Sequence, residues 1–232
     1  MNSIINSSLR LLKWPIAISA VLALPGLLLA SVDLGREIAD HRENVDPFLI
    51  GLTAYLVAWF VFLRERSLRD SSFWSTLEHE LTHILFTLIS FGKVRGLNAT
   101  DRQGGYIHHL GGGNWLIAIS PYFFPTLSLP VILLMPALDG DAQQIATGIL
   151  GVTAAYHITS THQEAHRQQT DLHYTGFRFA WCFLPAANFL SYGLILAMAS
   201  SGMGGMNDYV ANCWNESQAL FSQGFEHVKD LI

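Results

Sequence analysis

Charged residues are scarce in this sequence. Aspartate, glutamate, lysine and arginine together make up 13% of the 232 residues, whereas they make up about 25% of an ordinary soluble protein. Hydrophobic residues account for 50% of the chain. This balance argues against an ordinary soluble protein and indicates a chain that lies in a lipid bilayer.

Basic residues and cysteines are also few. The chain has 13 lysines and arginines against 18 acidic residues, with a net charge of -5. Nucleic-acid binding depends on a concentrated cationic surface, so we expect no nucleic-acid partner. The two cysteines, Cys182 and Cys213, are too few for a disulfide framework and lack the spacing of a cysteine-based zinc site.

Long apolar segments are what the sequence has instead. A helix needs about 20 predominantly apolar residues to cross a bilayer. Several segments meet this requirement, and weaker ones bring the expected number of transmembrane helices to about six. The segments are 14–32, 47–63, 72–91, 115–138, 144–160 and 177–200. We interpret the first as a membrane anchor rather than a cleaved signal peptide.

A pair of histidines stands within the apolar segment 72–91. His79 and His83 are four residues apart, so a helix places both imidazoles on one face, where both can reach one metal ion. Glu80 lies beside them and need not be a ligand. The same face continues with Thr76, Thr87 and Ser90. Because ionisable groups that face lipid are costly, this face must point into protein or a water-filled cavity, and we predict a metal site there.

A third ligand must come from elsewhere in the chain. A catalytic zinc ion usually has three protein ligands and a fourth position for water. Spacing leaves the third ligand open. The candidates are His108, His109, His157, His162, His166, His173, Asp139, Asp141 and Asp171. For Asp139 and Asp141 a solvated turn is the competing interpretation, and for Asp171 it is an N-cap of the helix that follows.

The sequence His79-Glu80-Leu81-Thr82-His83 in a membrane segment resembles the site-2 protease family of intramembrane zinc metallopeptidases. The resemblance covers roughly residues 72–200. It includes the glycine-rich segment 104–113, the proline-broken stretch 120–125 and an aspartate ahead of a later span. It implies that Zn2+ is the cofactor, that His79, His83 and Asp171 are the metal ligands, and that Glu80 is the catalytic residue.

The implied activity is that of a zinc metalloendopeptidase, which hydrolyses peptide bonds in or near transmembrane segments of membrane proteins. Zinc lowers the pKa of bound water toward about 7, and Glu80 acts as general base. The side chains of His108, His109 and Asn114 are candidates for a second donor to the oxyanion. The expected surroundings are a membrane-protein substrate, the lipid bilayer and a regulatory membrane partner. The expected location is the bacterial inner (cytoplasmic) membrane.

The expected fold is an all-α polytopic membrane protein of about six transmembrane helices, with a small glycine-rich β-hairpin-like insertion near the active site. The hairpin falls in segment 93–114, where it could bind an unwound substrate by strand addition or be an ordinary connecting loop. Three parts are expected. They are an N-terminal transmembrane helical pair (1–71), a metallopeptidase-like membrane core (72–201) and a C-terminal polar and amphipathic tail (202–232).

Two other classes of membrane protein use histidines in a similar way. Di-iron desaturases and hydroxylases hold two irons with histidine boxes, and this chain offers His79 with His83, His108 with His109, and His162 with His166. It lacks an H-x-x-H-H box, and two irons without zinc would identify that class. A zinc transporter is the second alternative, but the other apolar segments lack paired histidine and aspartate.

Overall fold

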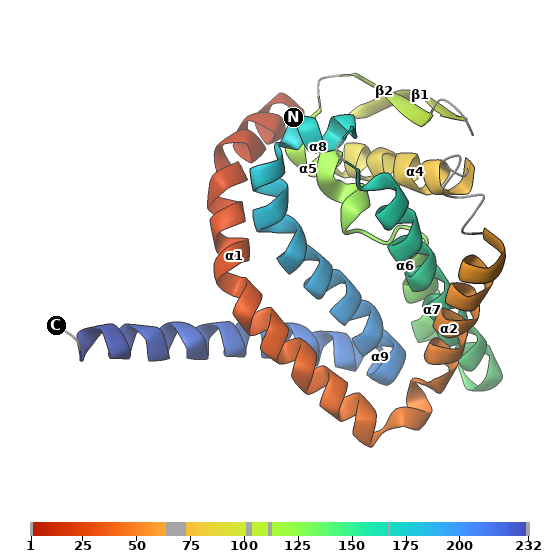
Figure 1. Ribbon diagram of the computed structural model, residues 1–232, viewed down its shortest axis with the longest axis vertical. Coiled ribbons are helices and arrows are strands. Elements are labelled where there is room, and N and C mark those ends of the chain that lie inside the picture. The colour runs from red at the N-terminus through yellow and green to blue at the C-terminus, as the bar shows by residue number, and fades with distance from the viewer. Residues whose placement is uncertain (1, 64–72, 101–103, 111–112, 167, 231–232) are drawn as a thin grey trace.

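The computed structural model describes residues 2–63, 73–100, 104–110, 113–166 and 168–230, and most of them are helical (Figure 1). In chain order the elements are α1 (Asn2–Asp40), η1 (Arg42–Asn44), α2 (Asp46–Ala58), η2 (Trp59–Leu63), α4 (Phe73–Ile89), β1 (Lys93–Thr100), β2 (Gly104–Leu110), α5 (Trp115–Ile119), η3 (Ser120–Tyr122), α6 (Ser128–Leu134), η4 (Met135–Ala137), α7 (Gly140–Glu164), α8 (Thr170–Thr175) and α9 (Phe177–Lys229).

The two longest helices, α1 and α9, pack against each other (Figure 1). Within the described ranges, these two have the length and composition to cross a membrane, over Asn2–Asp40 and Phe177–His227. The apolar stretches Asp46–Phe62 and Ser128–Ala137 are shorter. The expectation of about six spans therefore stays a prediction.

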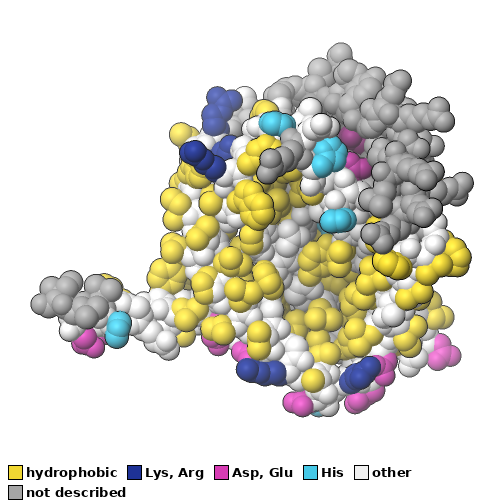
Figure 2. All heavy atoms as spheres, viewed as in Figure 1, with side chains coloured by type: hydrophobic (Ala, Val, Ile, Leu, Met, Phe, Trp, Pro, Cys, Tyr) yellow, Lys and Arg dark blue, Asp and Glu magenta, His cyan; other side chains and the backbone are white. Residues whose placement is uncertain are grey.

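Hydrophobic side chains cover a broad middle band of the surface. Figure 2 shows them over the centre of this face, whereas most of the visible lysine, arginine, aspartate and glutamate side chains lie near its upper and lower ends. Large side chains such as Leu11, Phe62 and Trp181 are more than 70% exposed. An apolar band bounded by charged ends is the surface that a bilayer solvates well.

Helix α9 changes direction at Gly202. Its φ of 64° and ψ of -148° are not helical, and a positive φ favours glycine because it has no Cβ. The helix beyond this residue crosses α1, where Tyr209 and Cys213 pack in a buried cluster with Leu27. Its last turns then extend beyond the rest of the molecule (Figure 1). The tail expected at 202–232 is thus helical where described, and it exposes Trp214 and Phe225. The division into three parts stays a prediction.

Helices α2 and α7 approach each other closely through glycines. A Cβ added to Gly51 would overlap the carbonyl of Gly148, and one added to Gly151 would overlap the carbonyl of Phe48. Small residues let two helix backbones approach in this way. Around the contact lies a buried apolar cluster of Val45, Phe48, Met135, Ala146, Leu150, Ala154, Ile195, Met198 and Ala199. This packing holds α7 against α2 and, through its later turns, beside α4.

Segment 115–138, expected as a single span, is a series of short helices. Asn114 begins α5 by accepting hydrogen bonds from the backbone N–H groups of Leu116 and Ile117, both at 3.0 Å. Pro121 then stands at the start of η3, where its ring is tolerated but cannot extend the preceding helix. The interruption brings α5 and η3 against α4.

Strands β1 and β2 pair in antiparallel fashion and pack beside α4 (Figure 1). Lys93 pairs with Leu110 at one end and Thr100 with Gly104 at the other, with a register shift between Val94 and Gly96. These strands occupy the segment where a hairpin-like insertion was expected. Binding of a substrate by strand addition stays a prediction.

Candidate metal centre

The histidine pair and Glu80 lie on a buried face of α4. His79 is 8% exposed, Glu80 is 5% exposed and His83 is 6% exposed. The neighbouring polar residues Thr76, Thr82 and Thr87 on this helix are buried as well, and so is Ser90 just after its end. The helix is covered by η3, α5, α7 and the β-hairpin. The polar face of α4 therefore points into protein, as its composition predicts.

Asp171, on the short helix α8, meets both histidines. Its Oδ2 atom lies 3.2 Å from Nε2 of His79 and 3.2 Å from Nε2 of His83. The three ligand atoms lie within 4.8 Å of one another. Among the described residues, this is the one group of three or more histidine, cysteine, aspartate or glutamate side chains that could hold a metal ion.

The tautomer of His83 is set by the backbone of α5. Its Nδ1–H donates to the carbonyl oxygen of Ile117 at 2.8 Å, because a carbonyl oxygen can only accept. In a neutral ring this leaves Nε2 as a lone pair directed at the carboxylate of Asp171. Two acceptors at this distance are stable only when a proton or a cation lies between them. Metal-ligating histidines are usually oriented by a hydrogen bond of this kind from the other ring nitrogen.

The ligand atoms lie near enough to one another to hold a single ion. Two of their separations are 3.2 Å, and all three atoms lie within 4.8 Å of one another. Two imidazole nitrogens and one carboxylate oxygen form a donor set that zinc accepts in catalytic sites. The residues present therefore fit the cofactor.

The interpretation of Asp171 as the N-cap of the following helix is wrong. Helix α8 begins at Thr170 with Gln169 at the N-cap, and Asp171 lies inside its first turn. Its backbone carbonyl accepts a hydrogen bond from Thr175 Oγ1 at 2.9 Å. Burial alone would raise the pKa of the Asp171 carboxyl, but its close contacts with the imidazoles of His79 and His83 outweigh burial and hold the pKa well below its usual range.

His157 belongs to a separate buried pair. Its Nδ1 lies 3.2 Å from Oε1 of Glu78, and both side chains are 2% exposed. This contact joins α7 to α4 beside the metal group.

Tyr122 packs edge-on against the ring of His79 with centroids 5.5 Å apart. Neither the contact of the Ile117 carbonyl nor that of Tyr122 could be predicted from the sequence, because neither residue type implies a contact with a distant histidine.

The remaining candidate ligands do not join this group. His162, His166, His173, Asp139 and Asp141 are exposed. Asn114 is buried at the start of α5, where its side-chain nitrogen donates to Asn6 Oδ1 at 2.9 Å. The side chains of His108 and His109 lie outside the part of the chain whose side chains the structure describes, so their proposed role as oxyanion donors stays a prediction.

Comparison with known families gives one match. The sequence profile of a family described as Peptidase M50B-like matches residues 52–219. The matched region begins within α2 and ends within α9, so His79, Glu80, His83 and Asp171 all lie inside it, whereas α1 lies outside. No curated protein and no solved structure matches the chain.

Proposed function

Because the chain belongs to the Peptidase M50B-like family, and so to the membrane metallopeptidases of the site-2 protease type, we propose that it is a zinc endopeptidase. Its substrates are membrane proteins, cleaved in or near their transmembrane segments. The observation that carries this proposal is the convergence of His79, His83 and Asp171 within 4.8 Å. Glu80 follows the first of these ligands directly in the sequence.

The ligands are Nε2 of His79, Nε2 of His83 and Oδ2 of Asp171. A bound zinc ion supplies a Lewis acid and lowers the pKa of water toward about 7. Ile117 keeps the His83 ring in the ligating orientation through its carbonyl oxygen. The packing of Tyr122 against His79 supports the orientation of the other ring.

Glu80 is the general base in this proposal. It takes the proton from the attacking water and returns it to the leaving amine when the peptide bond breaks. Its carboxyl interacts electrostatically with His83 and Asp171, so it lies close to the ligand group without being part of it. The burial of His79, Glu80 and His83 limits the access of bulk water, which strengthens electrostatic interactions at the site.

The other elements of the proposal concern the surroundings of the site. The substrate reaches the protein through the lipid bilayer, and a regulatory membrane partner controls this access. The membrane is the bacterial inner membrane. The di-iron alternative is not favoured, because the family is one of peptidases and the second histidine pair, His162 and His166, is exposed. The family match does not favour a transporter either.

The substitution Glu80→Gln tests the mechanism. Purified wild-type protein, reconstituted with a single-span membrane substrate, cleaves it and holds about one zinc per chain. The variant keeps the zinc, but cleavage falls at least about 100-fold because the base is lost. Glu37→Gln, which changes an exposed glutamate on α1, is the matched control and retains cleavage. Full activity of Glu80→Gln would remove this residue from the mechanism.

A further inference from the structure

A buried carboxylate at the end of α7 connects the two segments that carry the metal ligands. Glu164 is 9% exposed. Its Oε1 accepts a hydrogen bond from Ser75 Oγ at 3.1 Å, and its Oε2 accepts one from Gln169 Nε2 at 2.8 Å. Ser75 lies one helical turn before His79 on α4, and Gln169 lies two residues before Asp171. Both carboxylate oxygens are therefore engaged, one toward each ligand-bearing segment.

The direction of these hydrogen bonds is fixed by chemistry. An ionised carboxylate can only accept a hydrogen bond, so the Ser75 hydroxyl is the donor to Glu164. Ser160, one turn before Glu164 on α7, lies 2.9 Å from Ser75 and therefore donates to it. The chain of donors runs from Ser160 through Ser75 to Glu164, and Gln169 donates from the other side. Hydrogen bonds to a charged acceptor are stronger than neutral ones, and more so where water is excluded.

Helix α8 depends on such outside contacts. It has six residues and no side-chain N-cap, because the side chain of Gln169 is directed to Glu164 instead of to the helix. A helix this short has little stability of its own in isolation.

We propose that Glu164 is a positioning residue that holds Asp171 in place opposite His79 and His83, by binding Ser75 of α4 and Gln169 at the start of α8. This role rests on the proposed function, and it adds a residue that the HExxH pattern does not contain. Glu164 does not contact the substrate or the metal. It acts by reducing the freedom of the segment that supplies the third ligand.

Zinc affinity of purified protein, measured by competition with a chelator, is the first test. Glu164→Ala and Gln169→Ala each weaken zinc binding about 10- to 100-fold, the usual effect of removing a residue that orients a ligand. The double variant is no weaker than Glu164→Ala alone, because both changes remove the same connection. Glu164→Gln largely restores affinity, since its amide oxygen can accept from Gln169 while Ser75 turns to accept from its nitrogen.

Hydrogen exchange on metal-free protein is the second test, and it does not depend on zinc. The amides of Thr170–Thr175 exchange several-fold faster in Glu164→Ala than in the wild type. Thr159→Val is the matched control, because Thr159 is a buried residue of α7 whose hydroxyl meets Tyr55 on α2 rather than α8. This control leaves both zinc affinity and the exchange of α8 unchanged.

The two tests separate the possible failures. Unchanged exchange of α8 in Glu164→Ala overturns the proposal whether or not the protein binds zinc. Faster exchange with unchanged zinc affinity also overturns it, because the contact would then hold α8 without positioning Asp171 for zinc binding. If the His79→Ala variant binds zinc as tightly as the wild type, the proposed function fails instead. The exchange measurement then still decides whether Glu164 holds α8.

Discussion

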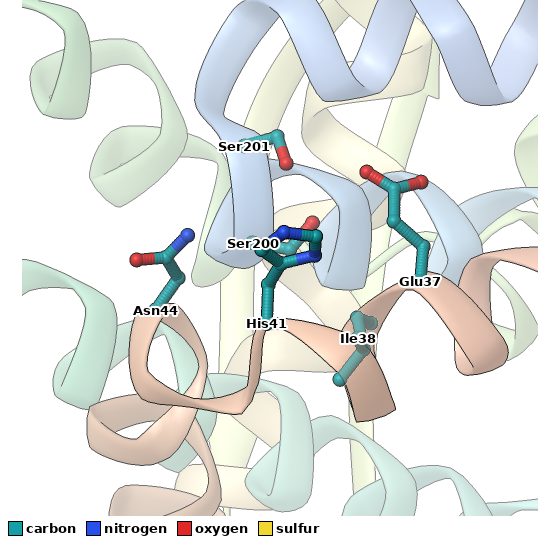
Figure 3. Close-up of a pocket in the computed structure, with 6 residues that line it drawn as sticks. All are labelled: Glu37, Ile38, His41, Asn44, Ser200 and Ser201. Atoms are coloured by element: carbon teal, nitrogen blue, oxygen red, sulfur yellow. The ribbon is translucent and has the colours of Figure 1, made fainter.

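Two pairs of ionisable side chains four residues apart, one on α4 and one where α1 ends, lie at opposite ends of this molecule. On α4, His79 and His83 are buried and meet Asp171. At the connection between α1 and α2, Glu37 and His41 line an open pocket of about 230 Å³ together with Ile38, Asn44, Ser200 and Ser201 (Figure 3). Figure 1 places this connection at the far end of the molecule from α8.

The difference between these regions shows that helical spacing is not sufficient for a metal site. Glu37 and His41 are exposed, and they border the pocket together with Ser200 and Ser201 of α9 (Figure 3). They do not belong to a convergent group of three ligands within the described residues. At the α4 site, a third ligand from another helix and a carbonyl that orients one ring complete the geometry. Burial then raises the strength of each interaction.

The largest expected difference between the regions is in zinc content. His83→Ala lowers the zinc of the purified protein from about one ion per chain to near none, because it removes one of three ligands. His41→Ala, the equivalent change in the open pocket, leaves the zinc content unchanged. Metal analysis of both variants checks this prediction. A wild-type level of zinc in His83→Ala would show that α4 is not the metal site.

The next difference concerns the pairs of charged or polar side chains beside each region. His157→Leu leaves the buried carboxyl of Glu78 without its partner and lowers the free energy of unfolding by about 3 kcal/mol. Asp46→Asn breaks the Arg42–Asp46 pair, whose side chains are 73% and 50% exposed, and costs less than about 1 kcal/mol. The free energy of unfolding of detergent-solubilised protein is measured for both variants. An equal loss of stability in the two would contradict the expectation that the buried pair contributes more than the exposed one.

The close packing of α2 against α7 leads to a smaller expected loss of stability. Gly151→Ala forces a Cβ against the carbonyl of Phe48, so α7 and α2 must move apart at a cost of about 1–3 kcal/mol. The same unfolding measurement checks it. A neutral Gly151→Ala would mean that α2 and α7 can separate without loss.

The smallest expected effect is at Gly35 on α1. Apart from the adjacent residues and the backbone of the same helix, no described atom lies within 4 Å of a Cβ placed there. Gly35→Ala therefore stabilises the helix by about 0.5–1 kcal/mol through its better helix propensity. Its unfolding transition is compared with that of Gly151→Ala. A loss of stability in Gly35→Ala would show that the region near Glu37 is packed more tightly than its open pocket indicates.

Some of the fold was visible in the sequence and some was not. The helical spacing of His79 and His83 and the polar face of α4 were predicted correctly, because both depend on residues within a few turns of one helix. The span expected at 115–138 is a series of short helices, and Pro121 and Pro125 mark places in the sequence where a helix is interrupted. That this segment crosses a membrane stays a prediction. Apolar composition alone cannot tell a continuous helix from several short ones.

The sequence by itself determined the family and the two histidines on one helical face, since both follow from local order along the chain. Only the tertiary structure decided which distant groups meet them. Asp171 lies 88 residues from His83, and the Ile117 carbonyl lies 34 residues from it. The bridge between Ser75 and Glu164 spans 89 residues. Such contacts depend on how α5, α7 and α8 pack around α4, because packing sets distances that spacing along the chain leaves free.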